Sequence, residues 1–115
     1  MSNKLEFNDK KNSAFGERMR EQREKLGLSQ EALGVSIGLD ESCSRTRISR
    51  YESGIHEPNI KTAKMLAKTL QIPLEYLYCE KKSIANIVLS LNKLNDEQME
   101  YVSKEIDKLT QTNTK

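Results

Sequence analysis

Three arginines stand close together in the middle of the chain, in a stretch without acidic residues. Arg45, Arg47 and Arg50 all lie within residues 42–51. A guanidinium group can donate two parallel hydrogen bonds to O6 and N7 of guanine, and a threonine such as Thr46 can hydrogen-bond a base edge or contact the methyl group of thymine. On one exposed helix, these side chains predict base recognition in the major groove of double-stranded DNA. The alternative interpretation is a solvated basic face without a ligand.

The overall charge argues for nucleic acid much less than this local cluster does. The chain has 115 residues with 19 basic and 17 acidic side chains, a formal net charge of +2. In the stretch before the cluster, Glu17, Glu21, Glu24 and Glu31 offset the neighbouring basic residues. A basic helix in a nearly neutral domain predicts a directed binding surface rather than a general affinity for polyanions.

The same survey of reactive residues predicts no enzyme. His56 is the only histidine, and Cys43 and Cys79 do not have metal-ligand spacing. No serine or cysteine has a base in a recognisable motif, and no glycine-rich phosphate loop is present. We therefore expect no catalytic residues, no metal and no cofactor. No apolar run approaches the roughly 18 residues that cross a bilayer, so we expect no membrane contact and a cytoplasmic location with reduced thiols.

The elements that must position the arginines are all predicted to be helices, because apolar residues recur at helical spacing and no stretch alternates for long enough to form a strand. A first helix begins at Phe15 and ends before Gly27. Ser29 caps a short second helix, and a polar connector over 39–43 leads to a third helix that carries the arginines. The predicted caps and stops of the third and later helices are Ser44, Gly54, Asn59 and Pro73.

The last third of the chain predicts two more amphipathic helices, over 83–92 and 95–109. Asn95 and Gln98 stand three residues apart, the spacing of a capping box. These two helices are too small to bury their own apolar faces, so we expect them to form a homodimer through a seam of residues at spacings of three and four. The predicted seam is Ile87, Leu91, Met99, Val102, Ile106 and Leu109. The alternative is that this hairpin packs back on its own domain.

Several motifs in order resemble the phage-repressor helix-turn-helix family, also called Cro/C1 or XRE. They are GLSQEAL at 27–33, ISRYESG at 48–54, and Pro58. The resemblance covers about residues 15–78. Two departures stand out. Gly34 replaces the usual alanine at the close contact of the two helices, and the joint before Ile48 is about four residues longer than usual, which lengthens the turn or extends the third helix backward.

The resemblance implies an all-α, five-helix lambda-repressor-like domain followed by a C-terminal helical hairpin. It implies that Ser44 caps the recognition helix and that the residues after it enter the major groove. It also implies that Gln30 contacts phosphate, and that Arg23 and Glu52 pair to fix the tilt of the helix. For these residues the alternatives are a simple surface glutamine and two separate surface charges.

His56 in its loop and Lys61 at the start of the next helix are expected to face phosphates, with exposure to water as the alternative. The complete predicted set of DNA-binding residues is Gln30, Ser44, Arg45, Thr46, Arg47, Ser49, Arg50, His56 and Lys61.

The sequence predicts a division of the chain into three segments and one main function. Residues 1–14 are expected to form a flexible tail, 15–80 the DNA-binding domain and 81–115 the dimerisation segment. The expected function is transcriptional regulation, as a repressor that binds a pseudo-palindromic operator as a homodimer. An antitoxin that also regulates its own operon is the alternative, and a toxin or antirepressor partner stays open. A protein-interaction module without DNA binding is a third interpretation, against which the arginines argue.

Overall fold

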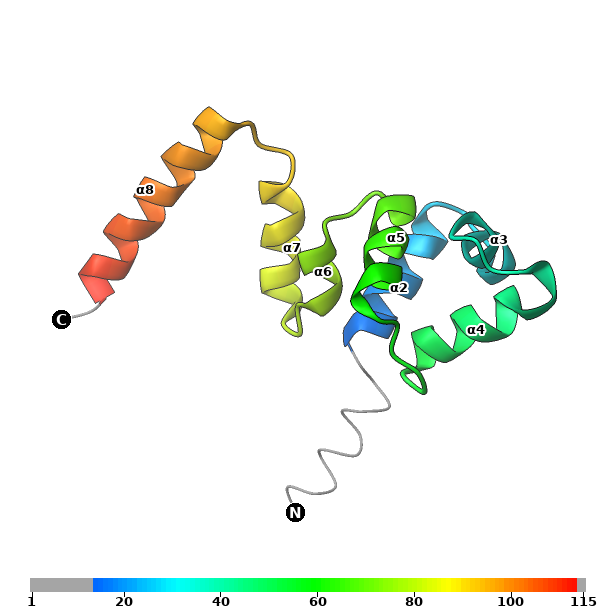
Figure 1. Cartoon of the computed structure of the whole chain (residues 1–115). Helices are drawn as coiled ribbons and strands as arrows, with labels where there is room; N and C mark the ends of the chain where they lie inside the picture. Colours follow the sequence, from blue (N-terminus) through cyan, green and yellow to red (C-terminus); the bar gives the residue numbers. More distant parts are fainter. Residues whose placement is uncertain (1–13, 114–115) are drawn as a thin grey trace, which may run out of the picture.

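The computed structural model describes residues 14–113, and every regular element in this range is an α-helix (Figure 1). The all-α prediction is confirmed over these residues. The tail predicted over 1–14 lies outside the described residues except for its last member, Ala14, which begins the first helix. None of the described helices is both long and apolar enough to span a bilayer. With the labels of Figure 1, the helices are α2 (Ala14–Lys25), α3 (Gln30–Ser36), α4 (Glu41–Ser53), α5 (Ile60–Leu70), α6 (Leu74–Tyr78), α7 (Lys82–Leu91) and α8 (Asp96–Asn113).

Helices α2 to α6 share one apolar core, as predicted for a five-helix domain. Each helix is too short to be stable alone, so burial of one stripe from each supplies most of the stabilisation. Helix α2 packs against α4, α5 and α6, and α3 packs mainly against α4. The fully buried apolar residues of this core include Met19, Leu33, Ile48, Leu66, Leu70 and Leu77.

Three predicted helix boundaries are confirmed by their hydrogen bonds and backbone angles. The Ser29 hydroxyl accepts a hydrogen bond from the backbone N of Ala32 at 2.9 Å, which caps α3. The Asn59 side chain accepts from the backbone N of Thr62 at 2.8 Å, which caps α5. Gly54 ends α4 with a φ of 82°, a left-handed conformation that glycine adopts without strain.

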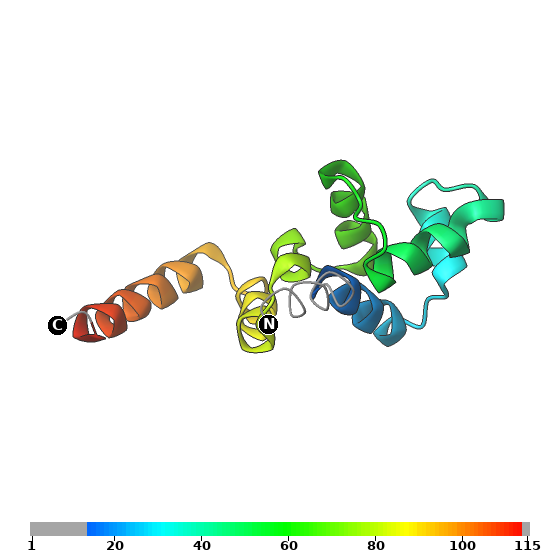
Figure 2. The same ribbon diagram turned by 90° about the horizontal axis from the view of Figure 1, so that it is seen from below.

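The two C-terminal helices differ from each other in how much they contact. Helix α7 packs on α6, buries Ala85 completely, and brings Val88 and Leu89 against the core. Helix α8 leads away from α7 and lies along no other described helix in either view (Figures 1 and 2). Its start is the predicted capping box, because the backbone N of Asn95 donates to Gln98 and the backbone N of Gln98 donates back to Asn95. Of the two helices in the predicted hairpin, only α7 therefore packs back on the domain.

Candidate nucleic-acid interface

Helix α4, which carries the arginines, begins one turn earlier than the sequence predicted. Its first residue is Glu41, and its N-cap is Asp40, whose side chain accepts from the backbone N of Ser42 at 3.0 Å. The prediction that Ser44 caps this helix is wrong, and the connector predicted over 39–43 is shorter. The additional residues of the joint extend the helix backward instead of lengthening the turn.

Ser44 lies inside the joint between α3 and α4 and is fully buried. Its hydroxyl donates a hydrogen bond to the backbone O of Glu31 at 2.7 Å. A Cβ placed on Gly34 would lie 1.9 Å from Ser44 Oγ and 3.1 Å from Ile48 Cγ1. The prediction that the joint requires a small residue is therefore confirmed, and Gly34 leaves the space that Ser44 occupies. Because Ser44 is buried, its predicted contact with DNA is wrong.

Helix α4 has one buried face and one broad polar face. Ser44, Ile48 and Tyr51 are buried, at spacings of four and three that follow one side of a helix. Among the residues predicted to contact DNA, the exposed ones on α4 are Arg45, Thr46, Arg47, Ser49 and Arg50. Every predicted base-contacting residue except Ser44 is therefore accessible on the same element, and the core beneath fixes the position of that element.

The exposed residues do not all point in the same direction. With successive residues about 100° apart around a helix, Thr46 lies almost opposite the buried face, and Ser49 and Arg50 lie roughly 50° to either side of that direction. Arg45 and Arg47 lie on the two flanks, roughly 90° to 110° from it. Thr46 therefore forms the centre of the polar face, and the guanidinium side chains of Arg45 and Arg47 border it.

Arg45 also borders a shallow depression between the starts of α3 and α4. The depression has a volume of about 510 Å³ and is lined by Arg23, Ser29, Gln30, Glu31 and Arg45. It brings an arginine of α4 beside Gln30, the residue predicted to contact phosphate. One side of α4 is thus continuous with the start of α3.

Beneath this depression, Arg23, Glu52 and Gln30 form a connected polar cluster. Arg23 Nε donates to Glu52 Oε2 at 2.6 Å and Arg23 Nη2 donates to Glu52 Oε1 at 3.2 Å. The third guanidinium nitrogen, Nη1, donates to the backbone O of Leu28 at 2.8 Å. The side chains of Arg23 and Glu52 are only 12% and 5% exposed, so neither is a separate surface charge. The hydrogen bond to Glu52 raises the pKa of Arg23 above its usual value, which keeps the guanidinium charged.

Gln30 joins the cluster through its amide nitrogen, which donates to Glu52 Oε1 at 3.1 Å. The side chain is half-buried rather than fully exposed. Glu52 therefore ties α2, the start of α3 and the end of α4 together. The interpretation of Gln30 as a simple surface glutamine does not describe this position.

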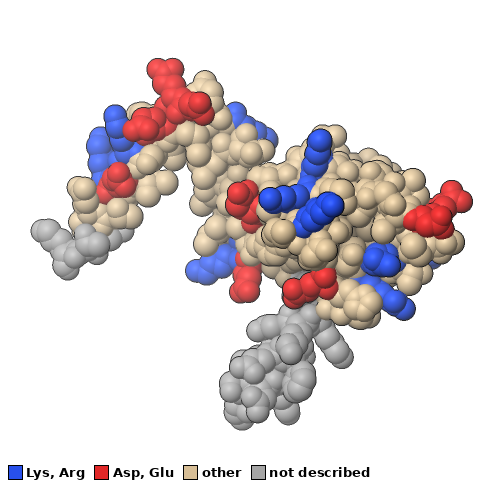
Figure 3. Space-filling model, viewed as in Figure 1, with Lys and Arg blue, Asp and Glu red and all other residues tan. Residues whose placement is uncertain are grey.

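His56 and Lys61 lie beyond the end of α4. His56 is exposed in the loop after Gly54, where its backbone N donates to the backbone O of Arg50 at 3.2 Å. Lys61 is exposed in the first turn of α5. In Figure 3, basic side chains gather over α5 and below α4, whereas acidic side chains gather at the edge of the molecule where α4 begins. The two ends of α4 thus differ in charge.

The residues predicted for the dimer seam are largely exposed within one chain. Ile87, Met99, Ile106 and Leu109 are 55%, 42%, 48% and 65% exposed, and Leu91 and Val102 are half-buried. Residues 14–113 contain no group of histidine, cysteine, aspartate or glutamate side chains arranged to hold a metal ion.

The residues that sequence analysis missed are those of the first turn of α4, above all Asp40 and Ser42. The available signal was the spacing of the buried residues: Ser44 stands four residues before Ile48, as an inward position of the helix would. Asp40 is also as good an N-cap by type as Ser44.

Comparison with known proteins agrees with this geometry. Residues 19–77 match a protein family described as "Helix-turn-helix". The chain is 40% identical over 63 residues to repressor protein C2 of Salmonella phage P22, and the match covers 55% of this chain and 27% of that protein. The chain thus spans only about a quarter of the length of that relative. Its structure is similar to the crystal structure of the transcriptional regulator BswR, with a TM-score of 0.74, 34% identity, and coverage of 81% of this chain and 92% of the other.

Proposed function

The chain belongs to the helix-turn-helix family of DNA-binding transcription regulators, and from this premise we propose that it represses transcription by binding a pseudo-palindromic operator as a homodimer. The observation that carries the proposal is the polar face of α4, which is exposed along its length and free of acidic side chains from Ser42 to Tyr51. A helix of this kind, fixed by a buried face and a tight joint, is what major-groove recognition requires. The same proposal places the protein in the cytoplasm, with the DNA it binds.

Within this proposal the exposed side chains divide into two groups. Arg45, Thr46, Arg47, Ser49 and Arg50 face base edges, where arginine is suited to guanine. Gln30, His56 and Lys61 surround the recognition helix and contact the phosphate backbone, which positions the protein without reading sequence. The Arg23–Glu52 pair, together with the hydrogen bond from Gln30 to Glu52, holds the start of α3 and the end of α4 in a fixed relation, so that both groups reach one duplex together.

The dimer follows from the apolar row on α8. Met99, Val102, Ile106 and Leu109 follow one side of the helix, and no other described helix covers them. A second copy of the same helix supplies a matching surface. In a two-fold dimer, two α4 helices would enter successive major grooves roughly 34 Å apart. Residues 15–80 then act as the DNA-binding domain and residues 81–115 as the dimerisation segment.

The uncovered row on α8 also favours one alternative, an antitoxin whose main partner is a small toxin protein. Sedimentation of the purified chain separates the two proposals. A dimer of the chain alone supports the repressor. A monomer that forms a one-to-one complex with a co-expressed partner protein supports the antitoxin.

Selection of binding sites from random duplex DNA tests the proposed function directly. The wild-type protein is expected to enrich an inverted repeat. The variants Arg45→Ala, Arg47→Ala and Arg50→Ala are each expected to lose about 1 to 3 kcal/mol of binding free energy per half-site and to relax the preference at one position. Unchanged preference in all three variants would exclude α4 as the recognition helix.

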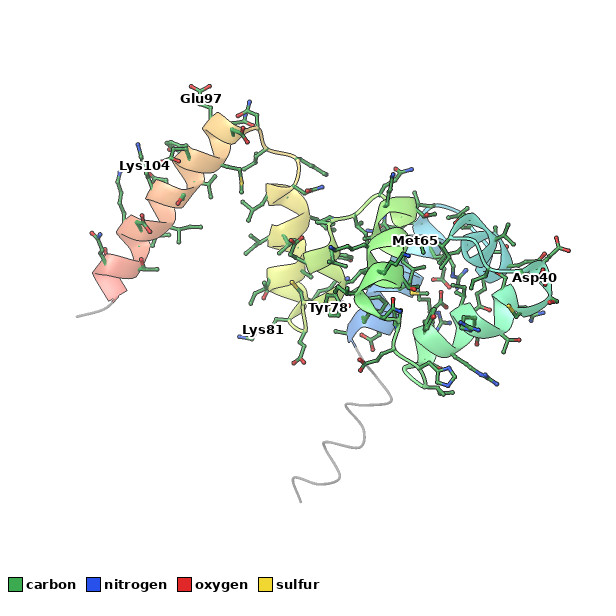
Figure 4. The ribbon with its side chains drawn as sticks, viewed as in Figure 1. Asp40, Met65, Tyr78, Lys81, Glu97 and Lys104 are labelled. Atoms are coloured by element: carbon green, nitrogen blue, oxygen red, sulfur yellow. The ribbon has the colours of Figure 1, made fainter. Side chains whose placement is uncertain are left out.

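A phosphate contact gives a different result from a base contact. Lys61→Ala is expected to weaken binding to all sequences equally and to reduce the slope of log affinity against log salt by about one. Lys104→Ala removes the same charge from α8, where Lys104 points away from the rest of the molecule (Figure 4), and serves as the control.

A further inference from the structure

The additional turn of α4 extends the polar face to Ser42. Residues 42, 46 and 49 are spaced by four and three, so Ser42 lies on the same side of the helix as Thr46 and Ser49, opposite the buried Ser44 and Ile48. All three hydroxyl residues are exposed. One turn adds about 5.4 Å of helix, and base pairs are about 3.4 Å apart, so Ser42 reaches one to two base pairs beyond Thr46.

The hydroxyl of Ser42 differs from the other hydroxyls on this face because its proton is already in use. Ser42 Oγ donates a hydrogen bond to Asp40 Oδ2, and the same carboxylate oxygen accepts from the backbone N of Ser42 at 3.0 Å. A serine hydroxyl has one proton and two lone pairs. Toward the groove, Ser42 therefore offers only lone pairs, and it acts as a hydrogen-bond acceptor.

We infer that Ser42, oriented by Asp40, selects a base that presents a hydrogen-bond donor in the major groove, namely cytosine or adenine, at a position outside those contacted by Thr46 and the arginines. The donors are the N4 amino group of cytosine and the N6 amino group of adenine. Guanine O6 and thymine O4 are acceptors and would oppose the lone pairs of Ser42. This inference rests on the proposed function and adds one specificity-determining residue to it.

The charges around Ser42 agree with this assignment. Asp40 lies at the outer edge of the molecule, at the start of α4 (Figure 4). The hydroxyl of Ser42, and then its backbone N–H, lower the pKa of the Asp40 carboxyl, so Asp40 is ionised at neutral pH and can only accept. Two exposed acids, Asp40 and Glu41, at this end of α4 would be repelled by phosphates. Asp40, which is hydrogen-bonded to Ser42, is compatible with DNA where it faces amino groups of bases, whereas Glu41 lies about 100° around the helix from Ser42.

The test is selection from random duplexes with wild type, Ser42→Ala and Ser42→Thr, read at each position of the half-site. Wild type is expected to enrich cytosine or adenine at one position at the outer end of the half-site. Ser42→Ala is expected to lose that preference by roughly threefold to tenfold, the effect of one hydrogen bond, and Ser42→Thr to keep it. Because Ser42 is exposed and the cap stays in place, all three proteins are expected to fold, which circular dichroism checks.

Asp40→Asn tests the role of Asp40, since asparagine still caps a helix but holds the Ser42 proton less strongly and brings a donor of its own. Guanine or thymine is then expected to become tolerated at the same position. Glu41→Gln, the control, removes one charge from the same end without touching the hydroxyl and should leave the preference unchanged.

The outcomes distinguish this inference from the proposed function. If wild type enriches no sequence, the proposed function fails. If wild type enriches a half-site and Ser42→Ala enriches the same one with equal preference at every position, the inference about Ser42 is wrong and the proposed function stands. An unchanged preference in Asp40→Asn would overturn the orienting role of Asp40.

Discussion

The domain formed by α2 to α6 and the terminal helix α8 differ in how the apolar sides of their helices are covered. Both are built from short amphipathic helices with one apolar side. In the domain, each apolar side is covered by another helix of the same chain, and Met19, Leu33, Ile48 and Leu66 are completely buried. Among residues 96–112 of α8, the part whose burial is described, none is buried, and Leu109 is 65% exposed.

The difference shows where the fold is complete and where it needs a partner. Burial of an apolar side chain contributes about 1.5 to 3 kcal/mol, so a helix that buries none gains little from its own chain. A glycine in α2 shows how closely the helices of the domain pack. A Cβ on Gly16 would meet the backbone O of Glu52 at 2.2 Å, which shows that α2 and α4 touch through their backbones. The domain is thus close-packed by itself, whereas α8 is available for association.

The largest expected effect is the loss of the dimer when α8 is removed. A chain that ends at Asn92 keeps α7 on the core, so we expect the domain to unfold at the same temperature but the protein to sediment as a monomer. Ile106→Glu should have the same effect because it places a charge in the apolar row. Lys104→Glu, on the opposite side of α8, is the matched control. A dimer that persists without α8 would contradict the contrast between the two regions.

Next in size is the effect of filling the joint between α3 and α4. Gly34→Ala brings a methyl group to 1.9 Å from Ser44 Oγ and 2.9 Å from Ser44 Cβ. We expect a loss of roughly 3 kcal/mol in the free energy of unfolding, since overpacking costs about 1 to 3 and the Ser44 hydrogen bond to Glu31 is lost as well. Urea unfolding measures it.

Ser44→Ala in the Gly34→Ala background separates the two contributions to this loss. Removing the hydroxyl should recover part of the stability, and the Cβ contact at 2.9 Å should keep the remainder. If the two substitutions are simply additive, Ser44 and Gly34 are not coupled as the structure indicates.

A smaller effect, about 2 kcal/mol, is expected for Glu52→Ala. The substitution leaves the nearly buried guanidinium of Arg23 without its carboxylate and also removes the partner of Gln30. Glu24→Ala provides the control, because Glu24 pairs with Arg20 on the surface at 3.5 Å with both side chains more than half exposed. That control should stay within about 0.5 kcal/mol. An equal result for the two glutamates would mean that the Glu52 cluster adds no stability.

The sequence was sufficient to predict boundaries that depend on one residue and its nearest neighbours. The caps at Ser29 and Asn59 and the capping box of Asn95 and Gln98 are of this kind. Each follows from a hydrogen bond between residues three apart, which local sequence determines. The all-α fold follows in the same way from the spacing of apolar residues.

The start of α4 could not be predicted in this way, because Asp40 and Ser44 are equally suitable caps. What decides between them is the space left by Gly34 ten residues earlier, which admits Ser44 into the core. A tertiary contact therefore overrides local preference and moves Ser44 from the DNA-facing set to the core. The direction in which α8 leaves the domain could not be predicted from the sequence either. An apolar row indicates that a helix will be covered, but it does not identify the surface that covers it.

The smallest expected effect concerns an ion pair that links α7, the helix before α8, to the domain, between Lys82 at the start of α7 and Glu21 on α2. Lys82 Nζ lies 2.8 Å from Glu21 Oε1, and the two side chains are 54% and 47% exposed. An exposed pair of this kind contributes about 0.2 to 1 kcal/mol, less at high salt. Lys82→Ala should lose that amount at pH 7, and Lys81→Ala, which removes the same charge one residue earlier, should not.

The pH dependence gives this last prediction its sharper form. The hydrogen bond from Lys82, and then the charges of Lys82, Arg18 and Lys25, lower the pKa of Glu21 in the folded protein, against a smaller opposing effect of burial. A carboxyl with a lowered folded-state pKa stabilises the fold above its unfolded pKa, about 4.3, and loses this contribution as the pH falls through the folded value. The difference in stability between wild type and Lys82→Ala should therefore be constant from pH 6 to 8 and shrink below about pH 4. A difference that persists under acid would mean that Lys82 holds α7 through the packing of its methylene groups rather than through the charge of Glu21.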